Sequence, residues 1–229
     1  MKSLFARLNW LIMACALAGC ASASVSHETR NEPVTSVAPS RVVVYPFATN
    51  PSEVTLNQNI FRRAYADLSG EDVPAAQTQV ADQAALTICW KVVNTLKSRG
   101  ISSSCIQRGD PPGIGNLMVI DGEFTKVHAG DPASRVVVGF GMGAAVLNAN
   151  VYVYQAPGTS NYYQVLSFKT HADSGAMPGI AVSGPVALLG GDATSSQTAT
   201  NDLGDKIAHE IVQVIFKYYL SQGWRAGGS

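Results

Sequence analysis

The apolar residues of this chain change their spacing several times along its length, and the order of these changes restricts the fold. From Gln79 to Arg99 they recur at helical spacing, and Gly100 follows as a helix stop signal. A second helix is expected to begin at Thr200 or Asn201, because either side chain can cap its first turn. The sequence therefore predicts two long helices separated by a non-helical segment.

Short β-branched, aromatic or alternating segments indicate strands before and between these helices. Residues Pro157–Asn161 have the composition of a five-residue hairpin loop, so the strands that flank them should pair antiparallel. We expect an α+β fold in which two principal helices pack on one face of a mainly antiparallel sheet. The expected strands are 41–48, 101–107, 117–128, 145–155 and 162–172, and a weaker pattern indicates one short helix near 59–68.

The first twenty residues have the layout of an export signal. Two positive charges precede Leu8, a mostly apolar segment follows, and Leu17-Ala18-Gly19-Cys20 closes it. This layout resembles a bacterial lipoprotein signal, in which the Cys thiol accepts a diacylglyceryl group before cleavage. The apolar run of 11 residues from Trp10 to Cys20 is shorter than the roughly 20 that a membrane-spanning helix needs.

The lipoprotein resemblance implies an address as well as an anchor. Acyl chains on Cys20, palmitate among them, would suffice for stable membrane attachment. Ala21 stands where an Asp usually retains a lipoprotein at the inner membrane, so the expected location is the outer membrane, facing the periplasm. Residues 21–40 lack apolar periodicity and should form a solvated tether. We expect a signal peptide at 1–19, the lipidated Cys and tether at 20–40, and one periplasmic domain at 41–229.

Composition excludes several classes of protein. Apolar residues make up 46% of the chain and charged residues 14%, which is too apolar for a disordered protein. The formal net charge is zero, which gives no electrostatic reason to expect a nucleic-acid partner.

The cysteines form one even pair once the export signal is accounted for. Of four Cys, Cys15 leaves with the signal and Cys20 is lipidated, so Cys89 and Cys105 remain in an oxidising compartment. A helix descending from Cys89 to Gly100 and a strand climbing to Cys105 each cover about 16 Å, which brings the sulfurs level. We favour a disulfide; the alternative is two buried free thiols that pack as small hydrophobic groups.

Two glycine-rich segments carry no established motif. Gly139–Ala144 fits G-x-G-x-x-A, but a strand pattern follows where a helix is needed and no acidic residue lies in 155–170. Its glycines are better explained by a strand that bends or bulges, so no nucleotide or other cofactor is expected.

The second segment, 175–191, is apolar yet broken by two prolines, so it cannot be one continuous helix. If exposed, it is the best candidate for a partner or subunit interface. The alternative, that it covers one end of the sheet, is equally compatible with the sequence. The candidate interface residues are Gly179, Ile180, Val182, Leu188 and Leu189.

Signals for catalysis are poor. His128, His171 and His209 are scattered without metal-ligand spacing, and there is no G-x-S-x-G nucleophile motif. Asp121 and Glu123 lie two apart on one strand face, where a solvated surface explains them better than a catalytic pair. We expect no metal, no cofactor and no enzymatic activity.

Several segments together resemble an uncharacterised family of Gram-negative envelope lipoproteins, catalogued as a domain of unknown function. They are VVVYPFAT at 42–49, LKSRGI at 96–101, NLMVIDGEF at 116–124, the stretch 134–154 and SFKTHADSGAMPG at 167–179. The element order is also similar to periplasmic lipoprotein domains of secretion-channel and polysaccharide-export accessory proteins and of cell-wall synthase activators. Such domains bind other proteins, sometimes in rings.

The resulting functional expectation is a non-enzymatic accessory or assembly module of the cell envelope. It would be held at the outer membrane by its lipid and would contact other envelope proteins or copies of itself. The alternative is a binding module for an apolar or glycan ligand, with aromatic side chains around the hairpin. Those side chains are Tyr152, Tyr154, Tyr162 and Tyr163.

Overall fold

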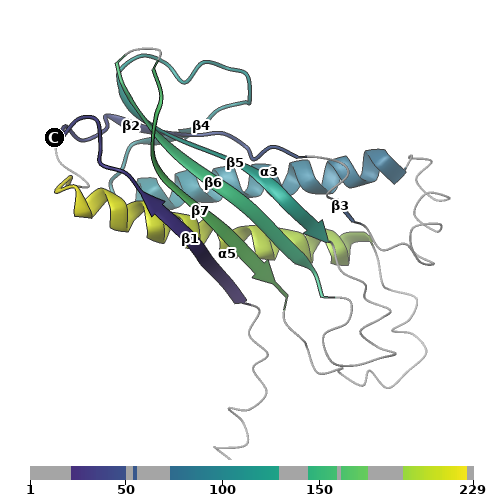
Figure 1. Cartoon of the computed structure of the whole chain (residues 1–229). Helices are drawn as coiled ribbons and strands as arrows, with labels where there is room; N and C mark the ends of the chain where they lie inside the picture. Colours follow the sequence, from purple (N-terminus) through teal and green to yellow (C-terminus); the bar gives the residue numbers. More distant parts are fainter. Residues whose placement is uncertain are drawn as a thin grey trace, which may run out of the picture.

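Two long helices, α3 (Val73–Ser98) and α5 (Ala193–Ser221), lie side by side against a mixed β-sheet (Figure 1). The structure, a computed structural model, describes residues 22–49, 54–55, 73–128, 144–158, 161–174 and 193–225. The strands are β1 (Ser22–Arg30), β2 (Arg41–Val44), β3 (Val54–Thr55), β4 (Ser103–Cys105), β5 (Asn116–His128), β6 (Val146–Pro157) and β7 (Tyr163–Asp173). Both helices begin several residues earlier than the sequence predicts.

The sheet has the order β1-β7-β6-β5-β2-β4, with β3 pairing with β5. The α+β class is confirmed, and β6 and β7 form the expected antiparallel hairpin. The prediction of a mainly antiparallel sheet is wrong, because β2 pairs in parallel with both β4 and β5, and β3 also pairs in parallel with β5. For β2 and β4 the physical reason is the crossover. Helix α3 carries the chain back along the sheet, so β4 starts at the same end as β2.

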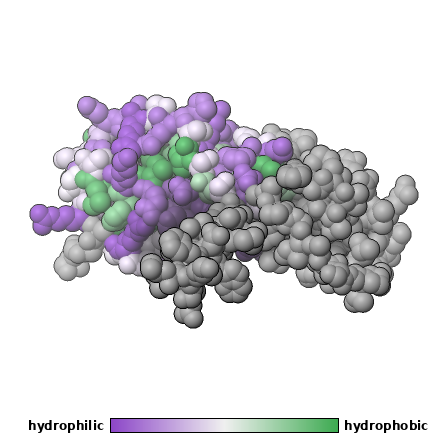
Figure 2. Space-filling view, turned by 90° about the horizontal axis from the view of Figure 1, so that it is seen from below, coloured by the Kyte–Doolittle hydropathy of each residue, from purple (hydrophilic) through white to green (hydrophobic). Residues whose placement is uncertain are grey.

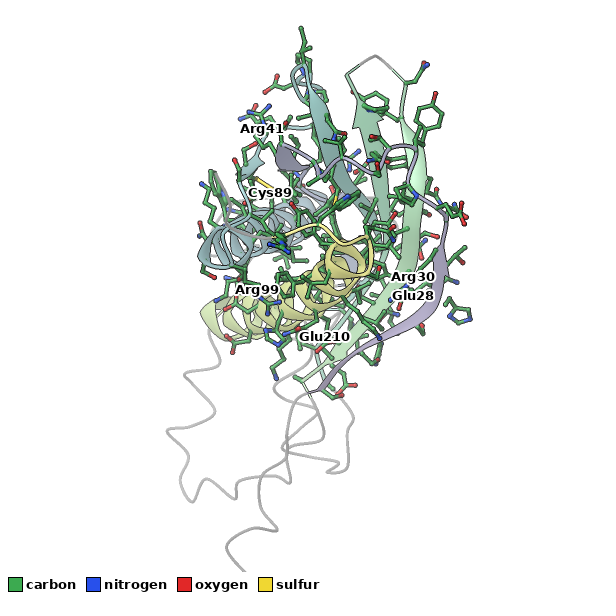
Figure 3. The ribbon with its side chains drawn as sticks, turned by 90° about the vertical axis from the view of Figure 1, so that its left-hand side faces the viewer. Glu28, Arg30, Arg41, Cys89, Arg99 and Glu210 are labelled. Carbon is green, nitrogen blue, oxygen red and sulfur yellow. A yellow bond between two sulfur atoms is a disulfide. The ribbon has the colours of Figure 1, made fainter. Side chains whose placement is uncertain are left out.

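The main core lies between the helices and the sheet, which Figure 3 shows from the side. In β6 every second residue is fully or almost fully buried, as expected for a strand with one covered face. Where α3 ends, the Arg99 guanidinium lies 4.7 Å from the centroid of the Phe216 ring of α5. The buried helix residues include Ala81, Ala85, Ile88, Val92 and Leu96 of α3 and Leu203, Ile207, Ile211, Ile215 and Tyr218 of α5.

The N-terminal segment belongs to the fold. Ser22–Arg30 is an edge strand that pairs antiparallel with β7. Beyond it, Val34 N–H donates to the Gln155 side-chain oxygen at 2.7 Å, and the Trp224 indole donates to the Ser36 carbonyl at 2.8 Å. The prediction of a solvated tether is therefore wrong for residues 22–40. An edge strand with one solvated face needs few apolar residues, so its composition resembles that of a linker.

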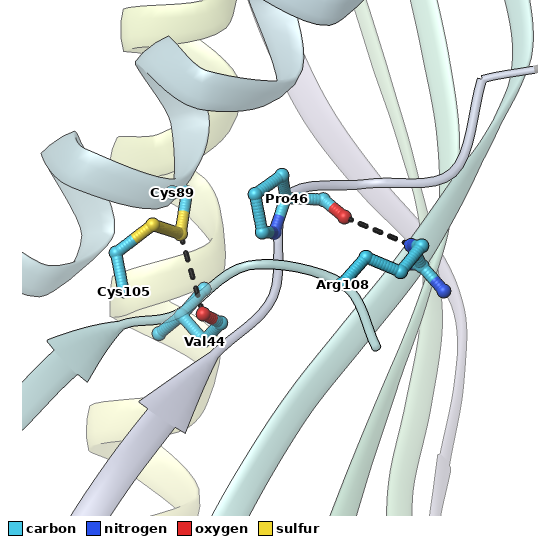
Figure 4. Close-up of a disulfide and its surroundings, with 5 residues drawn as sticks. All are labelled: Val44, Pro46, Cys89, Cys105 and Arg108. Atoms are coloured by element: carbon cyan, nitrogen blue, oxygen red, sulfur yellow. Dashed lines mark hydrogen bonds between the residues drawn. A yellow bond between two sulfur atoms is a disulfide. The ribbon is translucent and has the colours of Figure 1, made fainter. Parts of the chain in front are cut away.

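The predicted disulfide between Cys89 and Cys105 is confirmed, with their Cα atoms 5.8 Å apart (Figure 4). It joins α3 to β4 across the end of β2, and Cys89 Sγ lies 3.3 Å from the Val44 carbonyl oxygen. That approach is a van der Waals contact, since a disulfide sulfur has no hydrogen to donate. The bridge closes a separation of 16 residues, for which the chain-entropy model gives a stabilisation of about 3 kcal/mol.

Candidate functional site: the open face of the sheet

The two faces of the central strands differ in chemistry. Val151 and Val153 of β6 are buried under the helices, whereas Tyr152 and Tyr154 lie on the opposite face and are partly exposed. Within the part of the chain that the structure describes, no helix covers this second face (Figure 3). We call it the open face.

Tyrosines gather on the open face near the β6–β7 hairpin. Tyr45 and Tyr154 pack against a small second cluster of buried residues, and the Tyr45 hydroxyl donates to the Asp110 carbonyl at 2.7 Å. Burial raises the pKa of Tyr45, and the nearby Tyr162 and Asp121 raise it further. Tyr162 is 47% exposed, so the group presents aromatic surface to solvent. The second cluster consists of Val43, Leu117, Val119 and Ala156.

Arg108 links the loop before β5 to this group. Its guanidinium forms an ion pair with Asp121 and donates to the Gly122 carbonyl at 3.0 Å and the Pro46 carbonyl at 3.3 Å (Figure 4). The pair is substantially exposed, so its contribution to stability is at most about 1 kcal/mol. Its structural role is to fix the loop at the edge of the tyrosines.

A row of polar side chains extends the open face toward the other end of the strands. The Glu123 carboxylate accepts from Asn150 Nδ2 at 3.0 Å and from the Tyr152 hydroxyl at 3.2 Å. Burial and the bond to Glu123 raise the pKa of Tyr152. Further along, His171 lies 2.7 Å from Asn148 Oδ1 and 3.2 Å from Asp173 Oδ2. These groups are paired with one another along the sheet surface.

The structure divides the four tyrosines that the sequence brings together. Tyr152, Tyr154 and Tyr162 contribute to the open face. Tyr163 does not, because it pairs with Gln155, which in turn pairs with Met118 of the main core beneath the helices. Sequence reasoning missed Tyr45, although its position two residues after Val43 in the first strand is a signal that could have identified it. Asp121 and Glu123 share the face, each bonded to a different neighbour.

Other predicted site residues lie outside the described residues. These are Cys20 and the candidate interface residues Gly179, Ile180, Val182, Leu188 and Leu189, as well as Gly139–Gly143. Among the residues that are described, no group of three or more side chains is suited to hold a metal ion. None of the described helices is long and apolar enough to cross a membrane.

A second surface lies on the outer side of the helices. A shallow groove of about 550 Å³ runs between α3 and α5, where Trp90 is 52% and Leu86 45% exposed. Across the groove, Lys91 Nζ of α3 forms an ion pair with a carboxylate oxygen of Asp205 of α5 at 2.7 Å. The groove is open, its lining is about evenly polar and apolar, and it is formed by the surfaces of the two helices.

Comparisons with known proteins place the chain in a family without assigning an activity. No curated protein matches it. The similar solved structures include a PelC dodecamer from Paraburkholderia phytofirmans (11% identity, 82% of this chain and 98% of that chain, TM-score 0.34) and protein XCC0632 from Xanthomonas campestris (14% identity, 85% of this chain and 94% of that chain, TM-score 0.39). Residues 42–191 match the family model described as "Domain of unknown function (DUF4410)", and the chain belongs to this family.

Proposed function

We propose that the protein is a non-enzymatic accessory module of the cell envelope that binds other envelope proteins, or a second copy of itself, through the open face. A lipid on Cys20 would hold it at the outer membrane, facing the periplasm. The export signal supports this address, and so does the Cys89–Cys105 disulfide, since disulfides persist in oxidising compartments.

The observation that carries the proposal is the tyrosine group on a face that no described helix covers. Tyr and Arg are enriched in protein interfaces, because Tyr buries a large area with few rotatable bonds and Arg offers several hydrogen-bond donors. Tyr162 and Arg108 both lie near Tyr45, and Tyr154 lies near Asp121, the ion-pair partner of Arg108.

The free edge of β1 is a poorer candidate for contact. A bulge between Ser26 and Thr29 interrupts the strand, His27 has a φ of 53°, and Glu28 pairs with Arg30 beside it (Figure 3). Bulges and charges of this kind prevent another strand from adding to a sheet edge. Contact through the face is therefore favoured over strand addition.

A second candidate, binding of a glycan, is favoured by the same tyrosines. Aromatic rings beside amide and carboxylate groups suit a sugar, and Tyr152, Asn150 and Glu123 lie next to the group. The two candidates share the open face and differ in the bound partner.

Photo-crosslinking in cells tests both candidates. Benzoylphenylalanine at position 154 or 162 should give adducts with a discrete protein. The matched control is the same residue at position 90, an exposed aromatic site on the outer side of α3. Adducts from position 90 alone, or none from 154 and 162, would refute binding through the open face. Polysaccharide in the adducts would favour the glycan candidate. Mass spectrometry of the mature N-terminus tests the acylation of Cys20 separately.

A further inference from the structure

The pairing of β1 fixes where Ser22, its first residue, lies relative to the sheet. Ser22, the first described residue, is opposite Asp173 at the end of β7, and its hydroxyl lies 3.5 Å from Asp173 Oδ2. Asp173 is opposite Val146 at the start of β6, and Val146 is opposite His128 at the end of β5. These four residues mark one end of the sheet, which we call the anchor end.

Cys20 is only two residues before Ser22, so their Cα atoms are within about 7 Å of each other. The ladder from Ser22 to Arg30 holds this point against β7, and Asn31 N–H donates to the Val165 carbonyl at 2.9 Å. A lipid on Cys20 therefore has no free linker that would let the domain turn away from the membrane.

We infer that the anchor end faces the lipid headgroups and that the strands point away from the membrane. This inference rests on the proposed acylation of Cys20. Strand β5 has 13 residues and spans about 40 Å, so its far end is held well out from the bilayer. The far end carries Ile114, which is 95% exposed, together with Tyr162 and the loop held by Arg108.

The described strand residues near the anchor end carry polar side chains of both signs, with His171 beside Asp173. Lys169, His171 and Ser24 are exposed along the strands near this end. In the coloured part of Figure 2, which shows other described residues of the molecule from below, hydrophilic residues surround smaller, separate apolar areas. Attachment then depends on the acyl chains, and the polypeptide sets the orientation. A partner would approach the tyrosine group from the aqueous side.

Site-specific quenching by lipid tests this orientation. Lys126→Cys and Ile114→Cys place a fluorescent label near the two ends of β5, twelve positions and roughly 40 Å apart. Both sites are exposed, and Cys89 and Cys105 do not react with the label because they are bridged. The lipidated full-length protein is bound to phosphatidylethanolamine and phosphatidylglycerol vesicles whose headgroups carry a nitroxide. We expect a loss of fluorescence at position 126 and none at position 114.

Flotation of the same samples tests the membrane anchor separately from the orientation of the domain. If the protein does not float with the vesicles, the anchor is refuted and the orientation falls with it. If it floats but both labels lose fluorescence equally, or position 114 loses more, the anchor stands and the orientation is overturned.

A linker variant tests whether β1 is the cause. Twelve Gly and Ser residues inserted between Ala21 and Ser22 add a flexible reach of about 20 Å. Flotation should be unchanged, while the quenching at position 126 should be lost. Quenching that persists at position 126 would show that the strand does not set the orientation.

Discussion

The indole N–H of Trp224 donates to the carbonyl oxygen of Ser36 at 2.8 Å, so the last described turn of the chain holds the segment that leads from β1 to β2. The ring also contacts Tyr218 and Tyr219, at centroid distances of 6.1 and 5.2 Å. Residues 36 and 224, which are far apart in the sequence, thus meet at one corner of the domain.

Trp224→Phe should loosen this corner without unfolding the domain. The variant keeps an aromatic ring but removes the hydrogen bond to the carbonyl of Ser36, an exposed residue, which costs about 0.5–1.5 kcal/mol. We expect a lower urea midpoint and faster amide exchange in residues 34–37. Trp90→Phe, at an exposed site, is the control and should change neither quantity. Unchanged exchange in Trp224→Phe would contradict the role of the bond.

Gly122→Ala should destabilise the sheet because the flat surface of this glycine receives the Phe47 ring. A Cβ at position 122 would lie 2.7 Å from Phe47 Cε1 and 2.8 Å from the Asn150 carbonyl oxygen. Overpacking of this kind costs about 1–3 kcal/mol. The expected result is a lower free energy of unfolding in urea.

Gly204→Ala is the matched control and should change stability in the opposite direction. Its Cβ would meet Thr87 Cγ2 at 3.5 Å, an ordinary contact, and the position lies within α5. Replacing a helical glycine by alanine stabilises by up to about 1 kcal/mol. Equal destabilisation by both alanines would show that close packing at Gly122 is not the cause.

Joint replacement of Cys89 and Cys105 by Ser should lower the free energy of unfolding by about 3 kcal/mol, because a loop constraint is removed from the unfolded chain. A reductant should reproduce the shift in the natural chain and have no effect on the variant. An identical midpoint with and without the bridge would show that the disulfide adds nothing to stability.

Local patterns predicted the elements well and their arrangement less well. The period of the apolar residues identified both helices and the β6–β7 hairpin, because periodicity reports burial. The parallel pairing of β2 with β5 depends on how the chain returns after β4, which local spacing does not encode. In β1, apolar contacts are confined to a few positions such as Ala23 and Val25, so composition alone favoured a linker.

The sequence predicted only some residues of the open face, because alternation reports the two faces of a single strand and not the pairing between strands. Alternation separated Tyr152 and Tyr154 from their buried neighbours. It could not assign Tyr45 to the same face, because Tyr45 is distant in sequence. Nor could it reveal the register irregularity between Val153 and Tyr154, which leaves Tyr163 opposite Gln155. Sites formed by several strands require the register, and the register is a tertiary property.

Alkaline pH should destabilise the domain through its buried tyrosines. Burial raises the pKa of Tyr218 and Tyr219 above the ordinary value of 10.0, and the Tyr218 hydroxyl contacts the Asn31 carbonyl at 3.4 Å. The folded state therefore retains these protons more tightly than the unfolded state. Stability is fully present below the unfolded pKa and is lost as pH rises above about 10 through the folded values.

Urea midpoints between about pH 8 and pH 11 measure this loss, and absorbance at the tyrosinate band follows ionisation directly. Tyr218→Phe should reduce the slope above pH 10, since it removes one proton that the folded state holds. Burial and the hydrogen bond to Glu123 raise the pKa of Tyr152, so Glu123→Gln should lower that pKa. The same substitution should leave the pH dependence of stability that is due to Tyr218 unchanged. An unchanged slope in Tyr218→Phe would mean that alkaline unfolding arises elsewhere in the domain.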